Sequence, residues 1–372
     1  MLWKKLRVTL ICTLVLFATA ARAATLNVGP GQTYTTIQSA INAAGNGDTV
    51  LVAPGTYYEN IDFLGKAITV TSSAGAATTI LDGSKGQNPA VIFRNNEGSN
   101  SIFNGFTVQG GGFDGSPVPA GNYGTSGIVV TGGTPVISNN ILTHNFCNSI
   151  ESSGSPLIEH NEIDNTLDHG YCGSGGGSAI WLFGSLSVPQ VTVLDNLIQN
   201  NTLSGLDFAG GNGGAGIAVW GAYAAIIGNT IRNNKTLGDG GAILSFNTDY
   251  VVVLGNLIYG NQASTDGAIS LLPPGDTFGP FIGIVGSNTI YGNMQTASLG
   301  GPFADAPSTQ VYLSGNLGQY LLINNIIVGS GTDAVAVGCG STYNYLSITP
   351  LVFDHNDLYN ANGAAYGGAC PD

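Results

Sequence analysis

A short phrase recurs eight times along the chain and constrains its fold more than any other feature of the sequence. In each copy an apolar residue precedes an asparagine by three positions, and a second apolar residue follows the asparagine by two. The intervals between copies run from 21 to 37 residues, which is typical of a solenoid with one coil per repeat. The asparagines are Asn140, Asn161, Asn196, Asn229, Asn256, Asn288, Asn325 and Asn356.

The residues around each phrase favour strands over helices. Val, Ile and Thr dominate, and 57 glycines together with the asparagines punctuate the segments. A helical repeat would need ten or more residues with a period of 3.6 per unit, which the repeats do not show. Leucines at the fixed offsets of a leucine-rich repeat are also absent. We therefore predict a parallel β-helix.

The repeated asparagine has a structural role in such a coil. Its amide can donate to one neighbouring coil and accept from the other, which forms a ladder of buried hydrogen bonds. Asparagine also tolerates the left-handed backbone that a tight turn needs. We accordingly assign no catalytic role to these residues. A second asparagine follows five positions later in five copies, at Asn145, Asn201, Asn234, Asn261 and Asn293.

A further strand precedes each phrase, and its alternation separates inward from outward side chains. The inward column is Ile128, Ile150, Ile180, Ile217, Ile243, Ile269, Val311 and Val335. The first outward column is Val129, Glu151, Trp181, Ala218, Leu244, Ser270, Tyr312 and Ala336. The second is Thr131, Ser153, Phe183, Trp220, Phe246, Leu272, Ser314 and Gly338.

The first 23 residues have the three parts of a signal peptide. Basic residues at positions 4, 5 and 7 precede an apolar stretch over 8–20, and Ala21-Arg22-Ala23 is a small-x-small cleavage site. We expect the mature chain, 24–372, to form a single β-helix domain outside the cytoplasm, extracellular or periplasmic. No second long apolar run follows, so we expect no membrane insertion.

Charge limits the partners of the mature chain. Four of the nine basic residues lie in the leader, which leaves five against 22 acidic residues, a net charge of about −17. Such a chain is not expected to bind nucleic acid or anionic membranes. It is equally unsuited to strongly anionic polysaccharides unless calcium bridges the charges. We expect a monomer.

Four cysteines remain after removal of the leader, an even number that suits an exported chain. Cys339 and Cys370 each lie 14 residues after a repeated asparagine, at equivalent places on adjacent coils. Cys147 and Cys172 lie in neighbouring loops. We predict the disulfides Cys147–Cys172 and Cys339–Cys370, and favour them over a metal site because the spacing of Cys and His is not that of metal ligands.

Residues 33–61 are expected to cap the open end of the solenoid and to form the first coil. The apolar residues of 37–44 fall on one helical face, which Thr35 or Thr36 can cap and Gly45 can end. A strand over 49–53 and a turn at Pro54-Gly55 follow. A helix here would cover apolar core and unpaired strand edges.

The sequence resembles the pectin-lyase-like superfamily. The resemblance rests on APGTYYENI at 53–61, KAITVTSS at 66–73, FNGFTV at 103–108 and the eight asparagine phrases. It implies an all-β, single-stranded right-handed parallel β-helix, here of roughly ten coils. The superfamily includes polysaccharide lyases, glycosidases, pectin esterases, phage tailspikes and surface proteins without known activity, so the resemblance specifies a fold and not a reaction.

Enzymes of this superfamily generally work on the outer face of the strand aligned above. Among the two outward columns only Glu151 is acidic, and none of the five basic residues falls there. Lyase and esterase patterns are therefore not matched. A cluster of three carboxylates, Glu151, Asp168 and Asp207, together with His169, remains a candidate for glycoside hydrolysis, against a role of the loop acids in turns.

Calcium is the one cofactor left open by the sequence. Asp239 and Asp266 precede their strands at almost matching offsets and can bind calcium with loop carbonyls, although a plain turn is the simpler interpretation.

Aromatic residues of the outward columns form a stripe that can stack on sugar rings or be covered by loops. Two function classes thus stay open: a non-catalytic protein that recognises polysaccharide or another surface, and a hydrolase of a neutral glycan. The stripe consists of Trp181, Phe183, Trp220, Phe246 and Tyr312.

Overall fold

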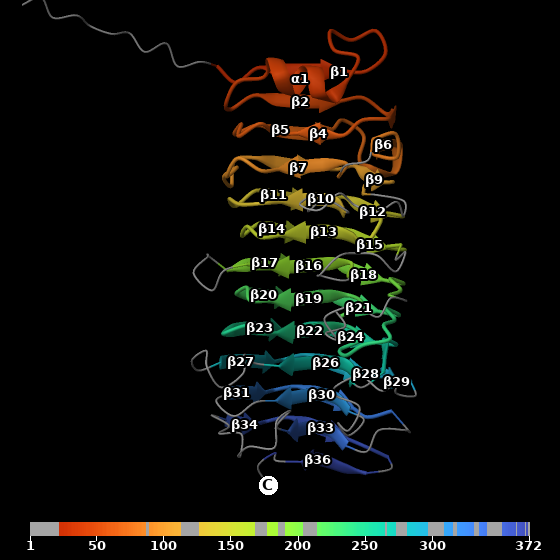
Figure 1. Cartoon of the computed structure of the whole chain (residues 1–372), viewed down its shortest axis with the longest axis vertical. Coiled ribbons are helices and arrows are strands. Elements are labelled where there is room, and N and C mark those ends of the chain that lie inside the picture. The colour runs from red at the N-terminus through yellow and green to blue at the C-terminus, as the bar shows by residue number, and fades with distance from the viewer. Residues whose placement is uncertain are drawn as a thin grey trace, which may run out of the picture.

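Short parallel strands stack into a solenoid capped by a helix at its amino-terminal end (Figure 1). The computed structural model describes residues 22–86, 89–112, 126–167, 177–184, 190–203, 214–264, 266–272, 281–296, 309–314, 318–330, 335–340, 352–361, 363–368 and 370. Three long sheets run along the solenoid, and every described pairing between their neighbouring strands is parallel. The predicted parallel β-helix is confirmed.

Sheet A holds the strands that precede the asparagine turn, and it has 12 strands. They are β1 (Thr25–Val28), β2 (Thr49–Val52), β5 (Thr69–Ser72), β8 (Ile102–Asn104), β11 (Val136–Ser138), β14 (Leu157–Glu159), β17 (Val191–Leu194), β20 (Ala224–Ile227), β23 (Tyr250–Leu254), β27 (Phe281–Gly286), β31 (Gly318–Ile323) and β34 (Val352–Asp354).

Sheet B holds the 11 strands that follow the turn. They are β3 (Gly55–Tyr57), β6 (Thr79–Asp82), β9 (Thr107–Gln109), β12 (Ile141–Thr143), β15 (Glu162–Asp164), β18 (Leu197–Gln199), β21 (Thr230–Arg232), β24 (Leu257–Tyr259), β28 (Thr289–Tyr291), β32 (Ile326–Val328) and β35 (Asp357–Tyr359). A two-stranded pair, β25 (Gln262–Ala263) and β29 (Met294–Gln295), continues two of these coils, and a short 3₁₀ helix spans Ala76–Thr78.

Sheet C completes each coil and also has 11 strands. They are β4 (Ile61–Asp62), β7 (Val91–Phe93), β10 (Ser126–Val130), β13 (Asn148–Ser152), β16 (Ile180–Phe183), β19 (Ile217–Trp220), β22 (Ile243–Phe246), β26 (Asp266–Leu272), β30 (Thr309–Ser314), β33 (Val335–Gly340) and β36 (Ala364–Gly368). Sheets of 11 and 12 strands agree with the roughly ten coils expected from the sequence.

The asparagine ladder runs unbroken through the eight repeated residues. In each step the backbone N–H and the side-chain amide donate to Oδ1 of the next asparagine, as from Asn196 to Asn229 at 2.9 and 3.0 Å. The amide also reaches the carbonyl of the preceding coil, as from Asn229 to Val193 at 2.9 Å. The last step joins Asn325 to Asn356. The predicted ladder is therefore confirmed.

The left-handed backbone at this turn belongs to the residue before each ladder asparagine. Asn139, His160 and Asp195 have φ of 55°, 54° and 52°, and Gly228 has 68°. The ladder residues themselves do not adopt positive φ, so the sequence-based placement was wrong by one position. The asparagine amide must point into the coil to bridge its neighbours, and the preceding residue makes the reversal.

A second ladder follows sheet B. Asn201, Asn234 and Asn261 bond in the same manner, and the amide of Asn293 ends the series on Oε1 of Gln310 at 2.9 Å. In the coil of Asn161, one of three that lack a second asparagine, Thr166 donates its hydroxyl to Asn201 Oδ1 at 2.8 Å.

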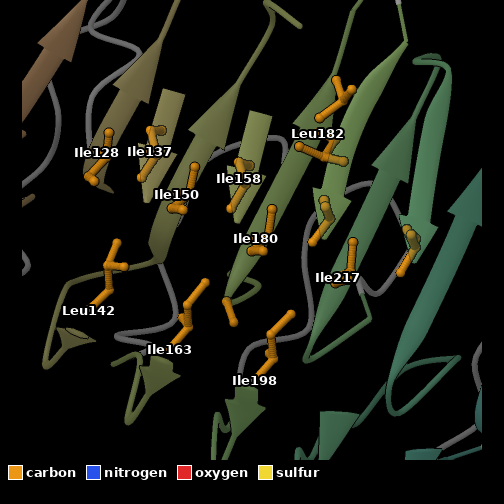
Figure 2. Packing of buried hydrophobic residues seen from close by; sticks show 14 of the residues in the cluster. Ile128, Ile137, Leu142, Ile150, Ile158, Ile163, Ile180, Leu182, Ile198 and Ile217 are labelled. Carbon is orange, nitrogen blue, oxygen red and sulfur yellow. The ribbon is translucent and has the colours of Figure 1, made fainter. Parts of the chain in front are cut away.

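The inward columns fill the interior with branched aliphatic side chains. Ile128, Ile150, Ile180 and Ile217 form one row, which faces the rows that start at Ile137 and Leu142 (Figure 2). All of these side chains are fully buried. Burial of one such side chain contributes roughly 1.5–3 kcal/mol, so each coil adds its own share of the core.

The amino-terminal helix α1 (Ile37–Ala43) covers the first coil as expected. Thr36 caps its start by accepting from the Ser39 N–H at 3.3 Å. The carboxylate of Glu59 accepts from the N–H groups of Ile37 and Gln38 at 2.8 and 3.0 Å. At the other end the Lys66 ammonium donates to three carbonyls, those of Ile41, Asn42 and Ala44.

One column alignment was wrong at the carboxyl-terminal end. Val311 pairs with Val337, whereas the sequence alignment had matched it to Val335. The outward residues of that strand are consequently Gly338 and Gly340. A shift of two residues keeps every side chain on its face, so alternation alone does not detect it.

The disulfides fall at this end and in the middle of the chain. Cys339 is bonded to Cys370, with Cα atoms 4.9 Å apart, as predicted. Cys147 is also disulfide-bonded. Its predicted partner Cys172 lies outside the described residues, as does the predicted signal peptide up to residue 21.

Candidate functional site

The outer face of sheet C carries the candidate site. The register aligns Glu151 with Trp181 and then with Ala218 on successive coils, and Phe183 with Trp220 and then Phe246. These residues come from the adjacent strands β13, β16, β19 and β22 (Figure 1). Because successive residues of a strand point to opposite faces, both rows face away from the core.

The aromatic rows are only partly covered. Trp181, Phe183, Trp220 and Phe246 are all half-buried. The rings of Trp181 and Phe183 stack with centroids 4.5 Å apart, and Trp220 meets Phe246 edge to face at 5.3 Å. An edge-to-face pair leaves one ring face without an aromatic partner. These four side chains therefore form an aromatic row across three coils that solvent reaches.

The stripe predicted from the sequence ends sooner than expected. Leu244, Leu272 and Tyr312 form a small buried cluster on the same sheet, with Phe246 packed against it. Tyr312 is only 5% exposed, and a Cβ at Gly340 would overlap its hydroxyl. Tyr312 is thus buried among its neighbours on sheet C and is not open to a ligand. The candidate ligand-binding residues are therefore the other four aromatics.

Glu151 is the acidic residue of the outward columns, and it is buried at 3% exposure. Burial raises the pKa of its carboxyl group, and the hydrogen bond from the Ser126 hydroxyl, 2.6 Å from Oε2, opposes part of that rise. Ser126 also accepts from the amide of Asn148 at 3.4 Å. Enzymes that use a carboxyl group as general acid often raise its pKa in this way, so that the group stays protonated at higher pH.

The other predicted catalytic residues, Asp168, His169 and Asp207, lie outside the described residues. The calcium candidates Asp239 and Asp266 are both buried on adjacent coils, and Asp266 accepts from the Thr309 hydroxyl at 3.1 Å. Over the part of the chain that the structure describes, no group of three or more His, Cys, Asp or Glu residues could hold a metal ion.

A shallow depression with no room for a water molecule lies at the turn between sheets B and C. Cys147, Thr166, Ser178 and Asn201 contribute to its lining. Thr166 and Asn201 already belong to the second ladder. The depression is therefore part of the turn itself and adds no new chemical group to the candidate site.

Sheet B carries a partly exposed column of side chains that the sequence analysis missed. Its residues lie three positions after each ladder asparagine, so the register was sufficient to find them. Arg232 donates to Gln199 Oε1 and to the Tyr259 hydroxyl, each at 2.8 Å, and Tyr259 stacks on Tyr291 at 5.1 Å. Tyr291 and Tyr359 are 40% and 61% exposed. This column gives a second aromatic surface against which the sheet C site can be compared.

The family comparison agrees with the architecture. A family model described as "Right handed beta helix region" matches residues 175–366, which is more than half of the chain. The chain therefore belongs to this family of right-handed β-helix proteins. No curated protein matches the sequence. Across the described residues, no helix is long and apolar enough to cross a membrane.

Several solved structures follow a similar chain path. An alginate lyase from Paenibacillus sp. str. FPU-7 is 14% identical with a TM-score of 0.43, and the match covers 93% of this chain and 98% of the lyase. The A-module of the Azotobacter vinelandii mannuronan C-5 epimerase AlgE6 is 14% identical with a TM-score of 0.34, covering 90% and 95%. The AlgE4 A-module is 13% identical with a TM-score of 0.40, covering 89% and 95%.

Proposed function

We propose that the protein is exported and binds a polysaccharide along the outer face of sheet C. The observation that carries the proposal is the partly exposed row of Trp181, Phe183, Trp220 and Phe246. Aromatic side chains combine a large apolar face with low conformational entropy, so a row of them in register suits the flat faces of sugar rings. Repetition along the solenoid suits a linear polymer, because each coil adds one contact.

We favour a neutral glycan. The mature chain has a net charge of about −17 with five basic residues, and among the described outward residues of β13 to β26 none is Lys or Arg. A strongly anionic polymer would be repelled at this face unless cations bridged the charges.

A carbohydrate-active enzyme of the glycoside hydrolase type is the second candidate. The buried carboxyl group of Glu151 and its raised pKa favour it, since glycoside hydrolysis needs a protonated general acid. A second carboxylate would have to come from Asp168 or Asp207. Glu151 is only 3% exposed, which leaves little of its carboxyl group open to a bound glycan, so we favour binding over catalysis.

A panel of soluble glycans tests both candidates. The mature protein is titrated with each glycan by isothermal calorimetry, and release of reducing ends is followed in parallel. We expect saturable binding to at least one neutral glycan, with affinity lost roughly tenfold or more in Trp220→Ala, since interface aromatics commonly contribute 2 kcal/mol or more.

Tyr291→Ala on sheet B is the matched control, because it removes an exposed aromatic ring from another face. Loss of affinity in Tyr291→Ala but not in Trp220→Ala would move the binding surface to sheet B. Reducing-end release that disappears in Glu151→Gln would replace the binding proposal with the hydrolase. A panel that shows no binding and no hydrolysis would contradict both candidate functions.

A further inference from the structure

Among the described residues, which start at Arg22, the first hydrogen bonds along the chain are those of Ala24. Its backbone nitrogen lies 2.7 Å from Oδ1 of Asp48, and its carbonyl accepts from the Thr49 N–H at 2.8 Å. Strand β1 starts at the next residue, and Thr25 pairs with Thr49 of β2. The fold therefore holds the chain from Ala24 onward.

The residues just before this point are open to solvent. Arg22, Ala23 and Ala24 are all exposed, and no strand or helix begins before Thr25 in the described part of the chain. The small-x-small pattern of Ala21-Arg22-Ala23 places a peptidase cut at the Ala23–Ala24 bond. The bond predicted from the cleavage pattern therefore lies in an exposed segment, directly before the first residue that the fold holds.

We propose that cleavage at this bond creates an α-ammonium group on Ala24 that forms an ion pair with Asp48 and closes the amino-terminal cap. In the hydrolysis, a peptidase adds water across the amide. The hydroxyl goes to the Ala23 carbonyl carbon, which leaves as a carboxylate, and the Ala24 nitrogen keeps its electron pair and is protonated to an ammonium. The inference rests on the proposed export of the protein but not on glycan binding.

The site is arranged to receive a cation. The other carboxylate oxygen of Asp48 accepts from the Gly45 N–H at 2.7 Å, just beyond the end of α1. The hydrogen bond from the Ala24 nitrogen, the bond from Gly45 and the positive charge of Lys66 all lower the pKa of the Asp48 carboxyl group. Asp48 is therefore ionised at neutral pH and faces the nitrogen that cleavage would charge.

Cleavage turns the neutral hydrogen bond between Ala24 and Asp48 into a charge-assisted one. Before it, Ala24 offers one amide hydrogen; afterwards it offers three hydrogens and a full charge, and charge-assisted hydrogen bonds are shorter and stronger than neutral ones. Asp48 then joins the new terminus to the end of α1, while Lys66 holds the last carbonyls of the helix. Processing therefore strengthens a contact that already joins the start of the edge strand β1 to the cap.

Two measurements test the proposal. The full-length chain is exported from a bacterial host and its amino terminus is sequenced; we expect Ala24 as the first residue. The acylation rate of the α-amine is then measured against pH. The Asp48 carboxylate should hold the amine protonated, so the wild type should react roughly threefold more slowly at neutral pH than Asp48→Asn, or slower still.

The control is Asp357→Asn, which removes an exposed carboxylate at the other end and should leave the rate unchanged. Should Asp48→Asn fail to fold, the wild type alone is tested at about 1 M salt, which screens an exposed pair and should raise the rate. A terminus other than Ala24, or equal rates in all variants and salt conditions, would overturn the proposal. An Ala24 terminus in a protein that binds no glycan would leave it intact.

Discussion

At the scale of single residues, the ladder asparagines determine most of the architecture. In the middle of the ladder, as at Asn229, the buried amide meets three kinds of partner: the next ladder residue, the carbonyl two positions earlier and a carbonyl of the preceding coil. This repetition was predictable, because only a residue with both a donor and an acceptor can bridge two identical coils. The position of the left-handed residue was not predictable. Asparagine, aspartate, histidine and glycine all accept positive φ, so the sequence does not say which residue of the turn reverses the chain.

Replacement of one ladder residue should be costly. Asn229→Ala removes the acceptor of Asn196 and the donor to Val193, so we expect a loss of about 3 kcal/mol in the free energy of unfolding, from two or three unsatisfied buried groups. Chemical denaturation measures it. Asn42→Ala on the exposed surface of α1 is the control and should change stability by less than about 0.5 kcal/mol. Equal effects of the two changes would contradict the structural role of the ladder.

The buried carboxyl group of Glu151 should make the stability of the fold depend on pH. Its pKa is raised in the folded state by burial, so between the ordinary carboxyl pKa and the raised one the folded chain binds more protons than the unfolded chain. Stability should therefore fall as pH rises through that window. Denaturation from pH 4 to 8 should show that Glu151→Gln lacks this loss and gains relative stability at neutral pH. Glu159→Gln serves as the control, and a parallel profile in both variants would count against the burial of an ionisable Glu151.

At the scale of elements, the two ends of the solenoid are closed by different means. The first coil is covered by α1, whose ends are held by Glu59 and Lys66, whereas the last coil is held by the Cys339–Cys370 bond. The helix and the disulfide were both predictable, one from its apolar face and the other from the shared offset of the cysteines. The contacts of Glu59 and Lys66 were not, because they join segments more than 20 residues apart.

The clamp on α1 depends on Lys66. In Lys66→Met three carbonyls at the end of the helix lose a charged donor, and we expect a loss of about 2 kcal/mol in stability together with faster proteolysis within the first coils. Lys85→Met removes a lysine that lies over the exposed Tyr58 ring and should have little effect. Unchanged proteolysis in Lys66→Met would show that the helix is held by apolar packing alone.

The disulfide should act locally. Without the Cys339–Cys370 bond, in the double change of both cysteines to alanine, we expect faster hydrogen exchange in β34 to β36 and unchanged exchange in the central coils. Overall stability should fall by at most about 3–4 kcal/mol for a loop of this length. A uniform rise in exchange along the solenoid would contradict a local role.

At the scale of the whole molecule, the repeat specifies the path of the chain but not what covers its outer face. The rows of Ile150 and Glu151 were assigned correctly to the inside and the outside. Burial of Tyr312 was not predictable, because it depends on a glycine on the next coil, Gly340, that leaves room for the Tyr312 ring. The repeat therefore does not say which side chains of the outer face are open to a ligand.

The most direct test of the account uses the tryptophans themselves. The chain has three, of which Trp3 lies in the predicted leader, so the mature protein contains only Trp181 and Trp220, both on the proposed binding face. Tryptophan fluorescence, titrated with the glycan that binds best by calorimetry, therefore reports from this face alone. We predict a saturable change in intensity or wavelength with the same dissociation constant as the calorimetric one. Calorimetric binding that leaves the fluorescence of both tryptophans unchanged would contradict the assignment of sheet C as the binding surface.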